Sequence, residues 1–406
     1  MSTRIVIIGG GLAAATAAEE LRARGHDGPI ELVTAEPRRP YQRPPLSKGY
    51  LSGAEGLDAV YVHPEGWEAQ HGVTLHLANP AERIVGRTVE LADGSVLPFD
   101  RLLLATGATP RTLELPGADA PGVHTFRTLD DADRLHAELA AGGQRVVLIG
   151  SGWIGLELAA AARGYGNAVT VISPDRVPLA TALGDEMGTV FRELHEEHGV
   201  VFQLEQSVLG IETGADGAVS GVRTERETVP ASVVIVGIGA VPDTALAATG
   251  GLRVERGILV DERLESSVPG IFAAGDVANA LHPVLGAHLR SEHWANAIAG
   301  GKVAASSMLD GDDVLDDVPY FYTDQYELGM EYSGYGPLTR DAELVIRGDR
   351  VEREFIAFWL LDGRVVAGMN VNVWDVNDQV QRLIRERIVV DPERLVDPAL
   401  ALESLG

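Results

Sequence analysis

The sequence predicts an α/β protein in which two doubly wound parallel-sheet domains precede a smaller C-terminal α+β domain. A buried strand, a glycine-rich loop, a helix and a second strand follow one another over residues 4–36, and the same order recurs over residues 145–175. From about residue 319 the pattern changes to strands rich in aromatic residues. Strands that alternate with helices favour parallel sheets, so the first two regions are predicted to be separate open sheets.

The first unit begins with the β-branched run Ile5–Ile8, which predicts a strand buried on both faces. The loop Gly9–Ala14 follows with the spacing G-x-G-x-x-A, and an alanine-rich helix is expected over Ala15–Gly25. A second strand is expected over Ile30–Thr34, and Glu36 follows it about 22–25 residues after the loop.

Each part of this unit has a physical use if the ligand is a dinucleotide. Gly9 permits the tight turn, and Gly11 lets the backbone approach the pyrophosphate. The small Ala14 lets the helix pack closely on the strand, and the helix N-terminus attracts the phosphate charge. Glu36 can accept hydrogen bonds from a ribose 2′-OH, so we predict a dinucleotide site here.

The segment Pro37–Lys48 contains four prolines, so we expect a stiff extended loop with neither helix nor central strand. Lys48 would then lie near the carboxyl ends of the strands, where ligands of open α/β sheets bind, or it would be a solvated surface lysine. Arg87–Phe99 is expected to form a hairpin. The strand Leu102–Leu104 stops at the small residues 105–108, where the backbone could lie against a planar ligand or simply turn.

The second unit repeats the device with a strand at Arg145–Ile149 and a full G-x-G-x-x-G loop at Gly150–Gly155. A helix over Leu156–Gly164 and a strand over Val169–Ile172 complete it, after a helix expected over Leu129–Ala140. Two such units in one chain predict two Rossmann-like domains and two dinucleotide sites.

The second unit departs from the usual pattern where the ribose-binding acid stands, because Ser173 occupies that position. Asp175 could still bind the 2′-OH of NAD, whereas Ser173 and Arg176 could accommodate the 2′-phosphate of NADP. The sequence leaves the choice between NADH and NADPH open.

The remaining segments are predicted as follows. Hairpin-like strands are expected over Val201–Thr224, and further strands at 233–236, 258–261 and 270–274. Gly275-Asp276 could place a carboxylate against a ribityl chain or phosphate-bound water, or could cap a helix. In the C-terminal domain we expect strands at Tyr326–Tyr332, Glu343–Ile346 and Glu354–Val373 with a turn at Asp362-Gly363, a helix at Asp375–Arg387 and a short helix within Pro392–Leu405.

Composition excludes several classes of function. The formal net charge of −26 argues against nucleic acid and anionic membranes as partners. No apolar run approaches the ~18 residues of a membrane span, and no basic leader with a cleavage site begins the chain, so we expect a cytoplasmic protein. The sequence contains no cysteine, which excludes disulfide chemistry, cysteine nucleophiles and thiolate metal sites, and we predict no metal site.

Several motifs together carry a resemblance to a known family. The two glycine loops, Ala105-Thr106-Gly107 and Gly275-Asp276 resemble the two-dinucleotide-binding flavoprotein superfamily. Within it, the chain is similar to FAD-dependent ferredoxin reductases of the putidaredoxin-reductase type. The motifs that carry this closer similarity are Pro44–Lys48, Gly152–Leu158, Glu292-His293-Trp294 and Tyr322–Gln325.

The resemblance implies a discontinuous FAD-binding domain at 1–111 and 241–315, an NAD(P)-binding domain at 112–240 and a C-terminal interface domain at 316–406. It implies that FAD contacts Gly9, Gly11, Ala13, Ala14, Glu36, Arg43, Lys48, Thr106, Gly107, Arg127, Asp276 and Trp294. It implies that NAD(P)H contacts Gly150, Gly152, Ile154, Gly155, Glu157 and Gly239. We expect Glu157 in the first turn of its helix, where it would form the catalytic ion pair with Lys48 beside the flavin. Glu157 could instead be an acidic residue on the surface of the helix.

The activity implied is hydride transfer from NAD(P)H to FAD, then single-electron transfer to a [2Fe–2S] ferredoxin that feeds a P450 or Rieske-type oxygenase. The alternatives are an NAD(P)H oxidase or quinone reductase, and a redox-switched interaction protein resembling apoptosis-inducing factors. Tyr322 stands where this family usually has a tryptophan, which puts the electron route in question. We expect a monomer or weak dimer, and an acidic ferredoxin would need a local basic patch such as Arg382, Arg385 and Arg387.

Overall fold

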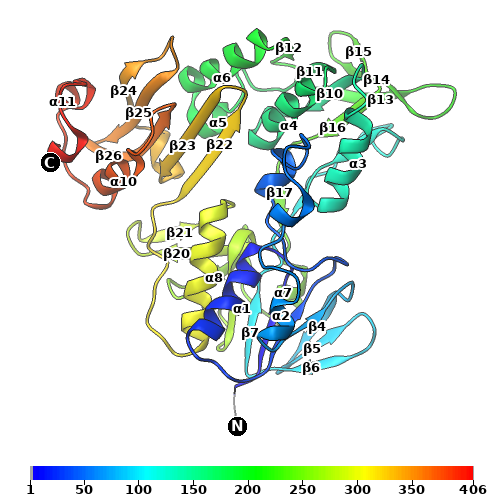
Figure 1. Cartoon of the computed structure of the whole chain (residues 1–406), viewed down its shortest axis with the longest axis vertical. Helices are drawn as coiled ribbons and strands as arrows, with labels where there is room; N and C mark the ends of the chain where they lie inside the picture. The colour runs from blue at the N-terminus through cyan, green and yellow to red at the C-terminus, as the bar shows by residue number, and fades with distance from the viewer. Residues whose placement is uncertain (1–2, 406) are drawn as a thin grey trace. The chain divides into compact units, whose positions relative to one another are not determined.

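The structure of the protein is a computed structural model that describes residues 3–405. Its internal contacts form two compact units, each built from three separate segments (Figure 1). Unit 1 comprises Met1–Pro44, Gly56–Thr109 and Ala240–Pro319, and unit 2 comprises Pro45–Glu55, Pro110–Gly239 and Tyr320–Gly406. The cofactor domains assigned from the sequence remain a prediction, since these units are defined by contacts alone.

Five parallel strands form the main sheet of unit 1, in the order β19-β7-β1-β2-β3. Their bounds are Ile271–Ala273 for β19, Arg101–Leu104 for β7, Ile5–Ile8 for β1, Ile30–Val33 for β2 and Val73–His76 for β3. Ile5 pairs with Ile30 on one side and with Arg101 on the other, so β1 is the central strand. All four of its side chains are buried, as predicted for a strand covered on both faces.

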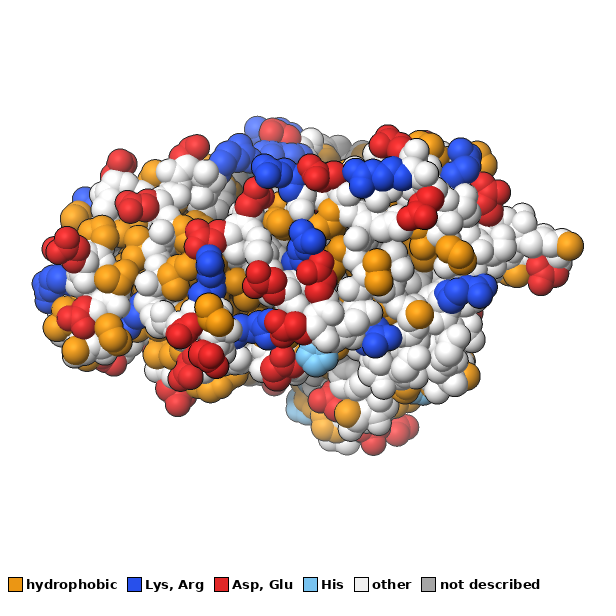
Figure 2. Space-filling view, turned by 90° about the horizontal axis from the view of Figure 1, so that it is seen from above, with side chains coloured by type: hydrophobic (Ala, Val, Ile, Leu, Met, Phe, Trp, Pro, Cys, Tyr) orange, Lys and Arg blue, Asp and Glu red, His pale blue; other side chains and the backbone are white. Residues whose placement is uncertain are grey.

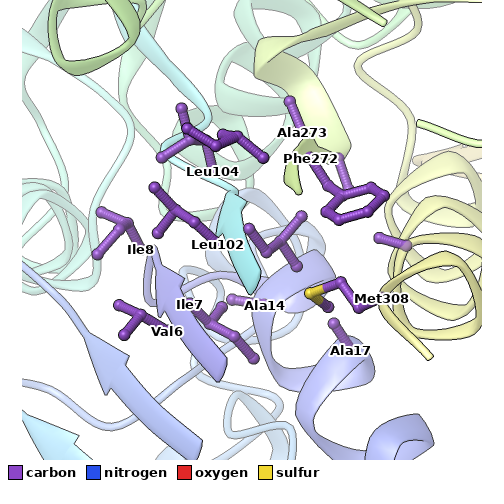
Figure 3. Close-up of a cluster of buried hydrophobic side chains, with 14 of the residues drawn as sticks. Val6, Ile7, Ile8, Ala14, Ala17, Leu102, Leu104, Phe272, Ala273 and Met308 are labelled. Atoms are coloured by element: carbon purple, nitrogen blue, oxygen red, sulfur yellow. The ribbon is translucent and has the colours of Figure 1, made fainter. Parts of the chain in front are cut away.

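Two helices of unit 1, α1 (Leu12–Ala23) and α8 (Trp294–Met308), pack side by side (Figure 1). They approach so closely that a Cβ added at Gly301 would lie 2.7 Å from the carbonyl oxygen of Ala13. Apolar side chains of β1, β7, β19, α1 and α8 form one core (Figure 3). Figure 3 labels Val6, Ile7, Ile8, Ala14, Ala17, Leu102, Leu104, Phe272, Ala273 and Met308 of this core.

Smaller elements complete unit 1. The predicted hairpin at 87–99 is confirmed by the antiparallel strands β5 and β6. The bounds are β4 Ala81–Val85, β5 Thr88–Leu91, β6 Val96–Pro98, β18 Ile258–Val260, β20 Ala278–His282, β21 Ala287–Leu289, α2 Trp67–Gln70 and α7 Ala245–Thr249, with 3₁₀ turns η2 Leu57–Ala59 and η3 Gly275–Val277. A two-stranded sheet joins β8 (Ala108–Pro110) and β17 (Ala240–Pro242).

A second five-stranded parallel sheet lies in unit 2, in the order β12-β11-β10-β16-β9. Its strands are β12 Val200–Gln203, β11 Ala168–Ile172, β10 Arg145–Ile149, β16 Val233–Val236 and β9 Val123–Thr125, and its helices are α3 Leu129–Leu139, α4 Trp153–Gly164, α5 Ala180–Leu183 and α6 Asp185–Glu197. An antiparallel sheet of β13 Val208–Thr213, β14 Val219–Thr224 and β15 Thr228–Pro230 accompanies it.

The prediction that the whole of Val201–Thr224 forms hairpins is wrong at its start. Val200–Gln203 pairs in parallel with β11, because α6 returns the chain to the same edge of the sheet. The sequence analysis did not predict α6, the crossover helix that makes this parallel pairing possible.

The C-terminal segment of unit 2 folds as an antiparallel sheet in the order β22-β23-β26-β25-β24. Its bounds are β22 Tyr320–Gln325, β23 Leu328–Gly334, β24 Glu343–Asp349, β25 Glu354–Leu361 and β26 Arg364–Val371, with α9 Gly336–Thr339, α10 Asn377–Arg385, α11 Pro392–Val396 and η4 Leu402–Ser404. The turn at Asp362-Gly363 is confirmed, with φ of 51° and 71°. The strand predicted at Tyr326–Tyr332 begins at Leu328 instead, because Tyr326 (φ 55°) lies in the turn after β22.

The proline segment differs from the prediction in one respect. Pro44–Ser47 forms a 3₁₀ turn, η1, rather than extended chain. Proline tolerates the first positions of a helical turn, where its missing N–H leaves no hydrogen bond unmade, and the N–H of Lys48 donates to the carbonyl of Pro45 at 3.1 Å. Within the described residues, no helix combines the length and apolar composition that a membrane crossing needs.

Candidate functional site

The first glycine loop lies between the end of β1 and the start of α1. Gly9 has a φ of 139°, and a Cβ there would lie 2.1 Å from the carbonyl oxygen of Ala105. Gly11 is the N-cap of α1, has no atom within 4 Å of an added Cβ, and provides no side-chain cap. Gly11 therefore leaves room for a phosphate at the N-terminus of α1, where the first N–H groups of a helix have no partner within the helix.

Ala13 and Ala14 serve the packing of α1. Ala14 is fully buried in the core, and a Cβ added at Gly275 would lie 3.1 Å from the Cβ of Ala13. Larger side chains at these positions would separate α1 from its neighbours and so move its N-terminus.

Glu36 is held beside the first glycine loop. The Tyr41 hydroxyl donates to Glu36 Oε2 at 2.5 Å, while the Tyr41 N–H donates to the carbonyl of Gly10 at 3.3 Å. The guanidinium of Arg43 lies 3.7 Å from Glu36 Oε1, and each of the two charged side chains is about one-third exposed. Glu36 thus retains an accessible carboxylate next to the loop, as a ribose-binding acid requires.

Thr106 and Gly107 follow β7 and are joined to the segment after β17. The Thr106 hydroxyl donates to the carbonyl of Asp243 at 2.6 Å, and the Asp243 N–H donates to the carbonyl of Gly107 at 2.9 Å. These bonds hold in place the segment of small residues at which β7 was predicted to end. The threonine hydroxyl therefore donates to a backbone carbonyl.

Asp276 follows β19 at the carboxyl edge of the parallel sheet, the same edge at which the first glycine loop lies, and Trp294 comes later in the chain. Asp276 sits in η3, and the guanidinium of Arg290 donates to its carbonyl at 3.4 Å. Trp294 begins α8, and its indole N–H donates to Gln42 Oε1 at 3.0 Å. Unit 1 therefore brings Trp294 close to the proline segment that carries Arg43.

The second glycine loop reproduces the first. Gly150 has a φ of 103°, and an added Cβ would lie 2.3 Å from the carbonyl oxygen of Gly237. A Cβ at Gly155 would lie 2.7 Å from the carbonyl oxygen of Gly150, so the start of α4 can pack this closely only with glycine there. Gly152, the N-cap of α4, faces open space, and Ile154 is 45% exposed beside it. This loop also fits a pyrophosphate.

Ser173 is buried, and its hydroxyl is engaged by its neighbours. The Ser151 hydroxyl donates to Ser173 Oγ at 2.9 Å, and Ser173 Oγ lies 3.2 Å from Asp175 Oδ2. The side chain of Arg176 is 74% exposed, and its guanidinium lies 3.6 Å from Asp185. Asp175 and Arg176 thus remain the accessible charges after β11, while Ser173 orients Asp175.

Two further predicted residues lie elsewhere in unit 2. Gly239 has a φ of 96°, and its carbonyl accepts from the N–H of Arg111 at 2.9 Å. The backbone N–H of Arg127 donates to Asp131, just before the capping box that starts α3.

Lys48 lies in Pro45–Glu55, a segment attached firmly to unit 2. The Tyr50 hydroxyl donates to Asp133 of α3, and the Tyr165 hydroxyl donates to the carbonyl of Leu51 at 2.8 Å. His136 also contacts that carbonyl, at 2.9 Å. These contacts place Lys48 against α4.

Lys48 and Glu157 form an ion pair in which Lys48 Nζ donates to Glu157 Oε1. The side chains of Lys48 and Glu157 are 17% and 7% exposed. Glu157 lies in the second turn of α4 rather than the first, because the helix begins at Trp153 directly after Gly152. Its burial excludes the alternative of a surface helix acid.

Glu157 accepts two further hydrogen bonds. The Ser47 hydroxyl donates to Oε2 at 2.5 Å, and the Thr323 hydroxyl donates to Oε1 at 2.7 Å. Thr323 Oγ1 also lies 3.4 Å from Lys48 Nζ, so it contacts both members of the pair. Three donors, on Ser47, Lys48 and Thr323, therefore hold the carboxylate in place.

The pair borders a pocket of about 420 Å³ within unit 2. Asp324 lines it, and burial, reinforced by Glu157 and Glu331 and opposed by Lys48, raises the pKa of the Asp324 carboxyl. Tyr322 on the same strand is 37% exposed, with its ring centroid 5.8 Å from Lys48 Nζ. Burial, with the nearby negative charges, raises the pKa of the Tyr322 hydroxyl.

Sequence reasoning named Ser47, Thr323 and Gln325 only as parts of motifs and did not name His195, so it missed their support of the pair. The sequence does carry one further signal for the lysine of the pair. Of the 33 Lys and Arg residues only two are lysines, Lys48 and Lys302. Lysine at 48, in a chain whose basic residues apart from Lys302 are otherwise arginines, indicates a need for a compact ammonium rather than a planar guanidinium.

The basic patch predicted on α10 is smaller than expected. Arg382 pairs with Glu386 at 3.2 Å and donates to carbonyls of the C-terminal segment, so it anchors the tail. Arg387 follows the helix with a φ of 52°, and Arg385 is exposed. On the face shown in Figure 2, acidic and basic side chains are interspersed rather than separated.

Comparison with known proteins identifies the family of the chain. The chain matches the family model described as pyridine nucleotide-disulphide oxidoreductase over residues 3–301, and the model described as reductase C-terminal over residues 320–406. The ferredoxin–NAD(+) reductase component of the anthranilate 1,2-dioxygenase system of Burkholderia cepacia is 39% identical over 402 residues, 98% of each chain. Rhodocoxin reductase of Rhodococcus erythropolis is 38% identical over 397 residues, 97% of this chain and 92% of that one.

A solved structure of the covalent putidaredoxin reductase–putidaredoxin complex superposes with a TM-score of 0.95 at 32% identity, covering 99% of this chain and 97% of that one. The matches confirm the resemblance drawn from the motifs and the predicted cofactors, FAD and NAD(P)H. The disulphide chemistry in the family's name cannot occur in this chain, which has no cysteine. The chain belongs to the pyridine nucleotide-disulphide oxidoreductase family and, within it, to the FAD-dependent reductases of the putidaredoxin-reductase type.

Proposed function

We propose that the protein takes a hydride from NAD(P)H onto FAD and passes single electrons to a [2Fe–2S] ferredoxin, which feeds a P450 or Rieske-type oxygenase in the cytoplasm. The observation that carries this proposal is the buried Lys48–Glu157 pair, which is built into a chain with two phosphate-binding loops and no cysteine. Catalysis by a cysteine nucleophile is impossible in this chain, whereas electron transfer through bound cofactors needs only positioning and charge.

The first loop, with Glu36, Arg43, Thr106, Asp276 and Trp294, would hold FAD, and the second loop would hold NAD(P)H. This assignment keeps the FAD domain at 1–111 and 241–315, the NAD(P) domain at 112–240 and the interface domain at 316–406. It is supported by the accessible carboxylate of Glu36 beside one loop and the mixed charges of Asp175 and Arg176 beside the other.

When bound, the two cofactors supply the hydride and electron chemistry. Lys48 supplies a fixed positive charge at Nζ, which would lower the energy of negative charge arising nearby. Glu157 holds that ammonium in place, and it would give way as the nicotinamide ring enters. Because both side chains are largely buried, the surrounding water screens their charges little.

The ferredoxin as acceptor is supported by the names of the three relatives above, each a reductase named with a ferredoxin, rhodocoxin or putidaredoxin. Docking on the C-terminal segment near Tyr322 and Trp374 is supported by the exposure of both aromatic side chains, 37% and 54%. A monomer or weak dimer would suffice, since each chain carries both loops.

Cytochrome c reduction by NAD(P)H, with and without an added [2Fe–2S] ferredoxin, tests the proposal. Strong ferredoxin dependence is expected. Equal turnover with oxygen or a small quinone alone would favour an oxidase or quinone reductase. Slow turnover with every acceptor would favour a redox-switched interaction protein.

A further inference from the structure

A buried chain of hydrogen bonds runs within unit 2 from α6 to the Lys48–Glu157 pair. His195 Nε2 contacts Gln325 Oε1 at 2.7 Å, and Gln325 Nε2 donates to Thr323 Oγ1 at 3.2 Å. Thr323 in turn donates to Glu157 Oε1 at 2.7 Å. His195, Gln325 and Thr323 are each at most 1% exposed. No water is therefore needed to complete the chain.

Chemistry determines the direction of every bond in this chain. A carboxylate only accepts, so the Thr323 hydroxyl must give its one proton to Glu157. Thr323 Oγ1 can then only accept from Gln325, which places the amide NH₂ toward Thr323 and the amide oxygen toward His195. His195 must therefore carry its proton on Nε2.

The neutral form of His195 agrees with this direction. Burial lowers the pKa of His195 to about 4, so a single ring nitrogen carries a proton at neutral pH. His195 Nδ1 is buried without a hydrogen-bond partner among the described residues, as expected for the unprotonated nitrogen. Tyr326 and Phe202 pack edge-on against the ring and hold its plane.

We propose that Thr323 and Gln325 are positioning residues: Gln325, oriented by His195, turns the Thr323 hydroxyl toward Glu157 and so holds the Lys48–Glu157 pair in one geometry. The inference rests on the proposed function, because it assigns these residues to the same reductive site. Without Gln325 the hydroxyl could rotate toward other acceptors, and without the hydroxyl both Glu157 and Lys48 would lose a contact.

Other charged or titratable groups also lie near Glu157. Asp324 and Tyr322 lie on the outward face of the same strand, and Tyr165 and Tyr326 line the adjacent pocket. None of them donates a hydrogen bond to Glu157 among the described contacts, whereas Thr323 does. The test therefore centres on Thr323.

The chain's two lysines give a direct measurement of the pair. Holoenzyme is treated with limiting acetic anhydride, and acetylation of Lys48 is measured by peptide mass spectrometry relative to the exposed Lys302. Thr323→Val removes the hydroxyl and Thr323→Ser restores it. Gln325→Leu removes only the amide. His198→Gln is the matched control, because His198 is a nearby histidine that takes no part in the hydrogen bonds between His195 and Glu157.

Thr323→Val should raise the relative acetylation of Lys48 about tenfold, the effect of one lost hydrogen bond to a charged group. Gln325→Leu should raise it a few-fold by the same criterion, and Thr323→Ser and His198→Gln should stay within about twofold of wild type. In stopped-flow experiments Thr323→Val and Gln325→Leu should slow flavin reduction at saturating coenzyme while leaving the coenzyme Kd unchanged.

Wild-type acetylation in both Thr323→Val and Gln325→Leu would overturn the proposal, and so would Thr323→Ser behaving like Thr323→Val. If Thr323→Val does not fold, Gln325→Leu decides alone. The acetylation experiment tests the roles of Thr323 and Gln325 whether or not the proposed function is correct. The proposed function is tested separately, and it fails if flavin in the Lys48→Ala variant is reduced at the wild-type rate.

Discussion

Lys48 and Glu157 are 109 residues apart in the sequence, yet they form a largely buried ion pair. Removing one partner of such a pair leaves an uncompensated buried charge, typically at a cost of about 3–5 kcal/mol. Replacing both partners by neutral residues removes that cost. Stability and reactivity can therefore be separated at this site.

Lys48→Met should lower the free energy of unfolding by about 3 kcal/mol or more and slow flavin bleaching under excess NAD(P)H at least about tenfold. Lys48→Met with Glu157→Gln should recover most of the stability but not the rate. Lys302→Met, at an exposed lysine, is the control and should change neither. Recovery of the rate in the double variant would show that Lys48 acts only through stability.

Gly11→Ala should leave the fold intact and remove the bound flavin. Gly11 has a φ of −99° and open space around an added Cβ, so alanine fits the apoprotein. The new methyl group would occupy the approach of the pyrophosphate. Absorbance at 450 nm and thermal melting measure the two effects, and Gly56→Ala, another open N-cap glycine, should remain yellow. A fully flavinated Gly11→Ala protein would contradict the loop assignment.

Stability should fall as pH falls from about 6.5 to 4. Burial lowers the pKa of both His195 and His293 to about 4, so in this window the unfolded chain binds more protons than the folded one. Each histidine contributes a slope of up to ~1.4 kcal/mol per pH unit, and the loss is complete below both pKa values. Urea midpoints of His195→Gln should depend less on pH than those of wild type. An unaltered dependence would show that His195 is not the group responsible.

Coenzyme choice should depend on the residues after β11. Ser173→Glu should raise the preference for NADH, because a carboxylate pairs with a 2′-OH and repels a 2′-phosphate. Ser173 is only 1% exposed, so melting curves must accompany the kinetics. Arg176→Ala, at an exposed side chain, should lower kcat/KM for NADPH several-fold more than for NADH. Unchanged ratios in both variants would place the ribose elsewhere.

Arg385→Glu should weaken ferredoxin-dependent turnover at low salt and reduce its salt dependence, if acidic ferredoxins dock on α10. Arg382 is unsuitable for this test, because it binds the carbonyls of the tail. Arg340→Glu, at another exposed arginine, is the charge-matched control. Equal salt dependence in the two variants would remove α10 from the docking surface.

The features predicted correctly are those encoded by neighbouring residues. Gly9 and Gly150 have the positive φ that their loops demand, and the hairpins at 92–94 and 362–363 form where Asp-Gly pairs occur. The helix containing Glu157 was placed three residues late, since nothing in Trp153 or Ile154 indicates a helix start.

The support of the site could not be predicted in this way. Thr323 meets Glu157 across 166 residues of sequence, and His195 meets Gln325 across 130. The alternation of Tyr322, Thr323, Asp324 and Gln325 could have shown that Thr323 and Gln325 share the buried face of a strand. Their partners depend on α6 and on the tertiary packing, for which no local pattern exists.

During synthesis, one of the two parallel sheets has all its strands available before the other. The sheet β12-β11-β10-β16-β9 draws all its strands from residues 123–236, whereas the sheet around β1 must wait for β19 at Ile271–Ala273. The sheet around β10 can thus form completely while the sheet around β1 still has an unpaired edge at β7. Exposed edges recruit other strands, and sheets completed by distant segments form slowly. In a growing chain of this kind, the region most exposed to misassembly is the first to leave the ribosome.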